Sequence, residues 1–96
     1  MYARVIKFTL ASGTRDDAIA MADKFYPITK TLPGFVSATY LIYDEQAGDY
    51  GSITVWQTKA DAENAAEKLG AHMSEQYAQA LKGPPELLTA EVYQPA

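Results

Sequence analysis

The chain has 96 residues, with 8 Lys and Arg, 12 Asp and Glu, one His and no Cys. The net charge of −4, without a basic cluster, has the wrong sign for binding a phosphate backbone, so nucleic acid is not an expected partner. Without Cys, the chain can form no disulfide, thiolate metal site or cysteine nucleophile, and one His cannot build a multi-histidine metal site unless a second copy supplies another.

Residues 1–96 are long enough for a single domain with a real core. A domain of this length buries only about two-thirds of its unfolded surface, so a partner subunit would help to stabilise it. We expect a cytoplasmic protein that does not insert into membranes, since the sequence opens with no apolar segment. No Gly-rich phosphate loop, nucleotide fingerprint or flavin motif is present, so no cofactor is expected.

The first third of the chain predicts a strand followed by a helix. The strand spans residues 3–10, and the face expected to point into the core carries Arg4, Ile6, Phe8 and Leu10. Thr14, with Asp17 three residues later, is a helix-capping pair, and apolar residues recur at helical spacing as far as Leu32. Pro27 lies inside this pattern, so we expect it to kink or interrupt the helix.

The middle of the chain predicts a second and a third strand joined by a hairpin. Pro33 and Gly34 turn the chain into a strand over residues 35–43, and Gly48 suits the polar loop that follows. Residues 52–56 are rich in β-branched and aromatic side chains, which predicts the third strand. Thr58 then stands where a helix cap is expected, with Asp61 three residues on.

The remaining residues predict a long helix and a last strand. The helical pattern runs over residues 59–82 and stops at Gly83-Pro84-Pro85, and residues 87–93 supply the strand. The resulting order, βαββαβ, predicts an α+β ferredoxin-like sandwich, in which both helices cover one face of a four-stranded antiparallel sheet. Because both faces of these strands carry apolar residues, we expect two subunits to pair through their uncovered sheet faces.

The chain carries four short motifs, which are Gly13-Thr14, Leu32-Pro33-Gly34-Phe35, Ile53-Thr54-Val55-Trp56 and Ala71-His72. Together they resemble the antibiotic biosynthesis monooxygenase-like family of dimeric α+β barrels. The resemblance covers nearly the whole chain and implies a homodimer whose subunits each hold a ligand cavity between sheet and helices. Activities in the family include cofactor-free oxidation of quinol-like aromatics, haem degradation, and small-molecule metabolic or signalling roles.

The resemblance also suggests residues for a site. Trp56 matches the Trp that lines the cavity in the quinone-forming members, and Ser52 stands where those members carry an Asn. The Tyr and Arg of their second helix have no clear counterparts here, Ala62 and Gln76 being the nearest by spacing. The haem-degrading members need an Asn where this chain has Ile6 and a Trp where it has Ala65, so haem degradation is disfavoured.

The main hypothesis is a cofactor-independent monooxygenase that acts on a small aromatic or quinol-like substrate. His72 is the candidate catalytic base, because it is the one side chain that titrates near physiological pH and it lies at the edge of the apolar stripe of its helix. The predicted substrate-binding residues are Trp56 as a stacking wall, Ser52 and Tyr77 as hydrogen-bonding groups, and Ile6 and Phe8.

Each of these residues also has a purely structural interpretation. Trp56 and Tyr77 are large enough to serve only the core, and an edge histidine is most often a boundary residue. Two alternatives therefore stand beside the enzyme: a non-catalytic dimeric binding protein for a small apolar metabolite, and an assembly unit whose cavity is filled. A cavity of about 300 Å³ or more, lined by Trp56 and reached by His72, would favour ligand use.

Overall fold

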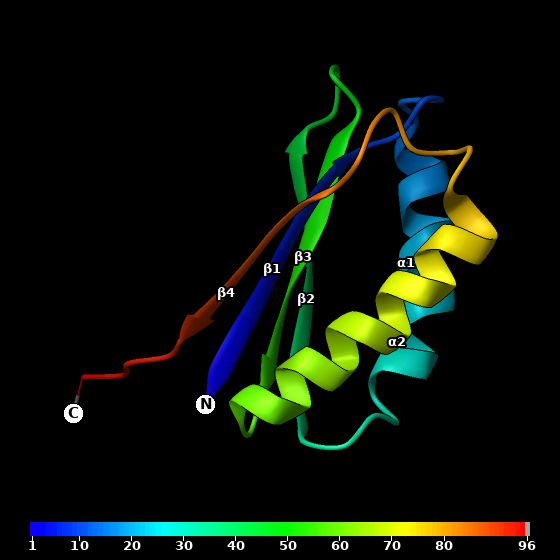
Figure 1. Ribbon diagram of the computed structural model, residues 1–96. Coiled ribbons are helices and arrows are strands. Elements are labelled where there is room, and N and C mark those ends of the chain that lie inside the picture. The colour runs from blue at the N-terminus through cyan, green and yellow to red at the C-terminus, as the bar shows by residue number, and fades with distance from the viewer. Residues whose placement is uncertain (96) are drawn as a thin grey trace.

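The computed structural model describes residues 1–95 and has the predicted order of elements. The elements are strand β1 (Tyr2–Thr9), helix α1 (Arg15–Thr29), strands β2 (Phe35–Asp44) and β3 (Asp49–Trp56), helix α2 (Lys59–Tyr77) and strand β4 (Glu86–Glu91). The strands form one four-stranded sheet in the order β2-β3-β1-β4, and every neighbouring pair is antiparallel. Both helices lie on the same face of this sheet (Figure 1), so the α+β ferredoxin-like prediction is confirmed.

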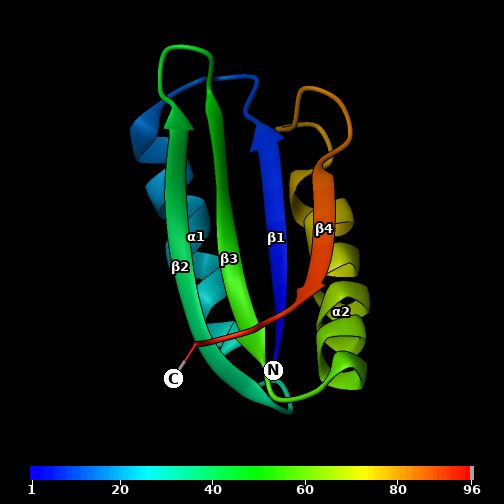
Figure 2. The same cartoon turned by 90° about the vertical axis from the view of Figure 1, so that its left-hand side faces the viewer.

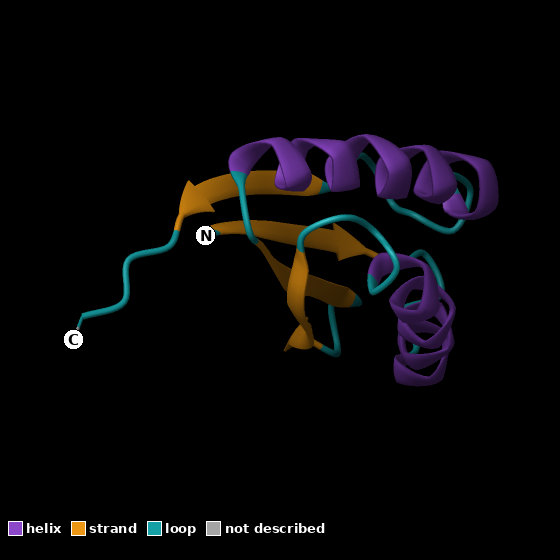
Figure 3. Ribbon diagram, turned by 90° about the horizontal axis from the view of Figure 1, so that it is seen from below, coloured by secondary structure: helices purple, strands orange, loops and turns teal. Residues whose placement is uncertain are grey.

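The helices divide the sheet between them. Helix α1 lies behind β2 and β3, and α2 lies behind β4 and β1, when the sheet is viewed from its uncovered side (Figure 2). Seen from below, the sheet is twisted, and the axes of the two helices point in different directions (Figure 3).

Helix α1 begins as predicted but passes through its proline. The Thr14 hydroxyl accepts a hydrogen bond from the Asp17 backbone N–H at 3.3 Å, which caps the first turn. Pro27 does not break the helix, which continues to Thr29. The proline stands in the last turn, where one missing N–H removes a single bond, and the Lys30 N–H still reaches the Tyr26 carbonyl at 3.0 Å.

Helix α2 is shorter than the sequence pattern predicted. It ends at Tyr77 instead of residue 82, because the next residues turn back and pair with the end of β1. The Ala11 N–H binds the Ala80 carbonyl at 2.8 Å, and the Lys82 N–H binds the Thr9 carbonyl at 2.8 Å. The last strand likewise ends at Glu91, two residues before the predicted end at residue 93.

The helix-facing side of the sheet holds the core. Trp56 is fully buried, and its ring meets the ring of Phe35 edge-on at 5.7 Å. The other buried members of the core are Leu10, Met21, Phe25, Tyr50, Ala62, Ala65 and Leu69. Strand register places Ser52 and Thr54 on this same side, because they pair with the buried residues Ile6 and Arg4 of β1.

The opposite side of the sheet is uncovered and partly apolar. Ile53 and Val55 lie there as half-buried residues, as the alternation along β3 predicted. Leu88 is 70% exposed on this face, and Tyr43 is 44% exposed. The Lys7 ammonium lies over the Tyr43 ring at 5.5 Å from its centre, which is the geometry of a cation–π contact.

Candidate functional site

A cavity of about 870 Å³ lies between the sheet and the two helices. Strands β1, β2 and β3 supply its floor, and α1 and α2 supply its walls. Its apolar lining includes Ile6, Phe8, Met21, Phe25, Leu69 and Met73. Cavities of roughly 300–1,000 Å³ that are mostly apolar, with a few convergent polar groups, are typical of small-molecule sites. The cavity is therefore open, which argues against the alternative of an assembly unit whose cavity is filled by side chains.

Arg4 places a positive charge on the floor of this cavity. The residue is only 5% exposed, and burial lowers the pKa of its guanidinium from the ordinary value. The one ion pair within residues 1–95 joins Arg15 to Glu45, so no carboxylate in this range pairs with Arg4. An arginine stays charged at physiological pH even when its pKa falls somewhat. The cavity thus contains a desolvated cation.

The guanidinium of Arg4 is not completely enclosed by the protein. Its nitrogens donate none of the side-chain hydrogen bonds found within residues 1–95. Yet no fully buried side-chain nitrogen or oxygen in this range lacks a hydrogen-bond partner. The two observations agree only if the Arg4 nitrogens retain accessible surface. Arg4 also lines the cavity, so the cavity is the space beside this residue that a ligand or water can occupy.

Two hydroxyl groups of β3 lie beside Arg4. Thr54 is directly opposite Arg4 in the β1–β3 pairing, and Ser52 is the next residue of β3 on the same face. The Thr54 hydroxyl accepts the Trp56 indole N–H at 2.9 Å and is placed to donate to the Arg4 carbonyl at 3.5 Å. The Ser52 hydroxyl, by contrast, makes no hydrogen bond within the described residues and is free to bind a ligand.

Two tyrosines complete the polar lining toward β2 and the hairpin. Burial raises the pKa of Tyr40, which is on β2 opposite Ser52. Burial also raises the pKa of Tyr50, and the negative charge of Glu45 adds to this effect. Both phenols are therefore neutral at physiological pH. Neither phenol serves as a base, and only the Tyr40 hydroxyl is free to donate to a ligand, because the Tyr50 hydroxyl donates to the Gly13 carbonyl.

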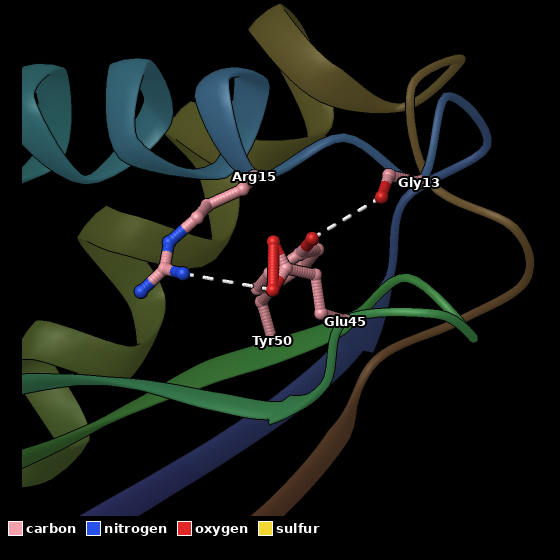
Figure 4. A network of polar contacts seen from close by, with 4 residues as sticks. All are labelled: Gly13, Arg15, Glu45 and Tyr50. Carbon is pink, nitrogen blue, oxygen red and sulfur yellow. Dashed lines mark hydrogen bonds and ion pairs between the residues drawn. The ribbon is translucent and has the colours of Figure 1, made fainter.

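Two of the lining residues, Arg15 and Tyr50, take part in polar contacts with the turn before α1 and with the β2–β3 hairpin (Figure 4). The Tyr50 hydroxyl donates to the Gly13 carbonyl at 3.2 Å, which ties β3 to the turn before α1. Next to it, the Arg15 guanidinium lies 3.6 Å from the Glu45 carboxylate, and both side chains are about half exposed. An exposed ion pair of this kind contributes little to stability. Arg15 also lines the cavity, so the lining carries a second cation.

The structure brings together three of the six predicted site residues. Ile6, Phe8 and Ser52 line the cavity, from neighbouring strands β1 and β3. Their grouping follows from alternation along the strands and the antiparallel register, both of which the sequence pattern predicted. Whether they contact a ligand stays a prediction.

His72 and Tyr77 lie outside the residues that line the cavity, contrary to the expected approach of His72. The His72 ring meets the Phe25 ring edge-on at 4.9 Å, and Tyr77 lies 5.4 Å from the same ring. Helix geometry explains the difference, since Leu69 and Met73 occupy the stripe that faces the cavity and His72 falls to one side of it. Both residues pack between the helices, and Phe25 stands in the cavity wall in their place.

Trp56 is also a core residue and not part of the cavity lining. It has no exposed surface and packs on Phe35, so it cannot stack on a ligand as expected without a rearrangement. Its connection to the site is indirect. The indole N–H donates a hydrogen bond to the Thr54 hydroxyl oxygen. The hydroxyl proton is then directed toward the Arg4 carbonyl oxygen on the neighbouring strand. Trp56 therefore helps to fix the strand that carries Arg4.

Arg4 is the functional candidate that sequence reasoning missed. The sequence pattern places it on the core-facing side of the first strand with three apolar residues, and a charged residue in such a row is unusual. That pattern was the one sequence signal for Arg4. It did not indicate that the guanidinium would have no carboxylate partner. Within residues 1–95 there is no group of three acidic or histidine side chains that could hold a metal ion, and no helix is both long and apolar enough to cross a membrane.

The sequence matches no known family model and no curated protein. Solved structures, in contrast, match it over nearly its full length. A protein of unknown function from Nitrosomonas europaea is similar with a TM-score of 0.80 and 14% identity, over 99% of this chain and 94% of that one. A candidate antibiotic biosynthesis monooxygenase from Bordetella bronchiseptica is similar with a TM-score of 0.78 and 12% identity, over 97% of each chain.

A third similar structure has a described activity. It is SnoaB, a cofactor-independent oxygenase from Streptomyces nogalater, with a TM-score of 0.75 and 21% identity, over 98% of this chain and 94% of that one. The TM-scores establish a shared fold, whereas identities this low leave the activity open. The resemblance predicted from the sequence motifs is confirmed at that level, and the chain has the fold of the antibiotic biosynthesis monooxygenase structures.

Proposed function

We propose that the cavity binds a small, electron-rich aromatic molecule and that the protein oxidises this molecule with molecular oxygen, without a cofactor. The observation that carries the proposal is a large apolar cavity with a buried, unpaired guanidinium on its floor. The apolar walls suit an aromatic ring, and the cation suits an oxygen atom that becomes negatively charged.

Such a substrate supplies its own reactivity once it loses a proton. A bound phenol near Arg4 is more acidic than in water, because the guanidinium favours the phenolate, and a phenolate ring is electron-rich enough to reduce oxygen. One oxygen atom of O₂ becomes the new carbonyl oxygen of a quinone product, and the other leaves as water with the two displaced hydrogens. The substrate provides all the electrons, so no external reductant is needed. The similarity in fold to a cofactor-independent oxygenase supports this choice of chemistry.

The proposal assigns a role to each cavity residue that the sequence had suggested. Ile6 and Phe8 contact the ring, and the Ser52 hydroxyl binds a second oxygen of the substrate. Arg4 replaces His72 as the group that favours deprotonation, since His72 packs on Phe25 outside the lining. The proton itself passes to water in the cavity.

A second candidate function is binding without chemistry. It is favoured by the absence of Asp, Glu and His from the cavity lining formed by residues 1–95, which leaves no ordinary proton acceptor beside a ligand. In this case the protein holds a small apolar metabolite, and the cavity shows saturable binding without oxygen consumption.

Oxygen uptake with 1-naphthol separates the two candidates. The wild type is expected to consume oxygen and to form 1,4-naphthoquinone faster than the protein-free solution. Ala66→Phe should abolish the reaction by filling the cavity, whereas Ala60→Phe, on an exposed position of the same helix outside the lining, should not. His72→Ala should retain activity, and Arg4→Gln should lose it. Saturable binding with no oxygen uptake in any variant would leave only the binding function.

We further propose that the protein acts as a homodimer through the uncovered face of its sheet. Exposed apolar residues on this face, such as Leu88 at 70% exposure, support the proposal. Half-buried Ile53 and Val55 continue the same surface. Light scattering should report a dimer for the wild type and for Ala20→Glu, an exposed position of α1, and a monomer for Leu88→Glu. A dimeric Leu88→Glu variant would exclude this interface.

A further inference from the structure

We propose that the cavity selects aromatic ligands that carry one anionic group, and that Arg4 with Ser52 forms the recognition site for that group. This inference rests on the proposed role of the cavity in ligand binding. It does not depend on oxidation, because it concerns which molecules bind and not what happens to them afterwards.

The charges around the cavity point to an anion. Its lining contains two cations, Arg4 and Arg15, and no Asp or Glu among the described residues, although the whole chain has a net charge of −4. Arg15 is exposed and has Glu45 as a partner, but Arg4 is buried and has none. A buried charge is unfavourable unless something pairs with it, and an anionic ligand is the partner that the protein itself does not provide.

The hydrogen-bonding groups fit a planar oxyanion. The Arg4 guanidinium retains accessible surface, Arg4 lines the cavity, and an arginine can bind the two oxygens of a carboxylate at once. Ser52 lies next along the floor, since it pairs with Ile6, two residues from Arg4 on the same face of β1. Its hydroxyl makes no bond within residues 1–95 and can donate to the same group.

The rest of the cavity limits the ligand to a largely apolar body. Its walls are formed by aliphatic, aromatic and methionine side chains, which include Phe8, Met21, Phe25, Leu69 and Met73. A second charged group would have to lie against these residues without a partner, which is unfavourable. The preferred class is therefore an aromatic monoanion, with its charged end on the sheet floor and its ring between the helices.

Calorimetric titration under nitrogen tests this selectivity without any turnover. The probes are 2-naphthoate and 2-naphthylmethanol, which share the ring and differ in charge. The wild type is expected to bind naphthoate at least about tenfold more tightly, as a charge-assisted hydrogen-bonded pair implies. Arg4→Gln should remove the preference, and Lys24→Gln, which removes a charge from an exposed residue of α1 outside the lining, should keep it.

A second variant tests the same site in case Arg4→Gln does not fold. Ser52→Ala removes one hydroxyl and leaves the charge, so naphthoate binding should weaken by about threefold to tenfold while the neutral probe is less affected. Circular dichroism confirms that each variant is folded before titration. The combination of a lost preference in Arg4→Gln and a partial loss in Ser52→Ala supports the proposal.

Two results would overturn it. Equal affinity of the wild type for the two probes would exclude anion selection, and yet the oxidation of neutral phenols proposed above could still be correct. A preference for naphthoate that survives Arg4→Gln would place the anion site elsewhere. Failure to oxidise 1-naphthol, in contrast, would reject the oxygenase and leave the selectivity for anions unaffected.

Discussion

Replacement of Arg4 by Met is expected to stabilise the fold and to weaken ligand binding at the same time. Arg4 is 5% exposed, it has no carboxylate partner within residues 1–95, and burial lowers its pKa. The fold therefore disfavours the charged form of this residue. Methionine keeps much of the apolar stem and removes the charge, so the penalty for burying the guanidinium disappears.

The size of the effect follows from the surroundings of Arg4. Replacing buried charged groups with apolar residues of similar volume often stabilises proteins by about 1–4 kcal/mol. The Arg4 nitrogens retain some accessible surface, which reduces their desolvation, so we expect the lower part of this range, about 1–2 kcal/mol. For a domain of this size, each kcal/mol raises the melting temperature by about 4–8 °C.

Urea unfolding followed by circular dichroism measures this change in the free energy of unfolding. Wild type and variant are compared at one protein concentration, because a dimer gains stability with concentration. Lys24→Met is the control for a change of charge and helix propensity at an exposed position. If Arg4→Met lowers the free energy of unfolding by more than about 1 kcal/mol and leaves naphthoate binding unchanged, the charge is satisfied within the protein and our assignment of Arg4 is wrong.

Four further predictions concern stability, and the first three use the same denaturation assay. Gly34→Ala should destabilise by about 1–2 kcal/mol, because φ is +76° at this turn, and an unchanged midpoint would contradict the strain argument. Gly51→Ala should cost about 2 kcal/mol or more, since a Cβ there would collide with the Ile6 carbonyl oxygen; a smaller loss would mean that β1 and β3 separate easily. Gly70→Ala should stabilise by about 0.5–1 kcal/mol, as a Cβ on this helical residue meets nothing within 4 Å, and destabilisation would indicate a close contact. Burial raises the folded pKa of Tyr50 above its unfolded value of about 10, so stability should fall as pH rises beyond that value. Tyr50→Phe should flatten this alkaline loss, measured as thermal stability against pH, and an identical profile would exclude Tyr50 as its source.

The fold was predictable because local signals and periodicity agree along the whole chain. Thr14 and Thr58 cap the two helices as their spacing with later Asp residues indicated, and the alternation along β3 separated its two faces correctly. The errors lie at element ends. Helix α2 has no local signal at Tyr77, and its end is decided by backbone pairing of residues 80–82 with the end of β1, which is distant in sequence.

The site was only partly predictable, since cavity walls depend on angles between helices that a sequence pattern does not give. Ile6, Phe8 and Ser52 follow from strand alternation alone. His72 stood at the edge of the apolar stripe, and the side to which an edge residue turns depends on how far apart the helices lie. The structure turns it toward Phe25 and away from the cavity lining.

If the cavity between the sheet and the helices binds its ligand as proposed, Arg4 contacts that ligand. Arginine side-chain N–H signals in nuclear magnetic resonance spectra test this most directly, because Arg4 and Arg15 are the only arginines in the chain. Arg15→Lys assigns the two signals, and 2-naphthoate is then titrated into the wild type. Our account predicts a saturable shift of the Arg4 signal. Binding that leaves the Arg4 signal unchanged would contradict it.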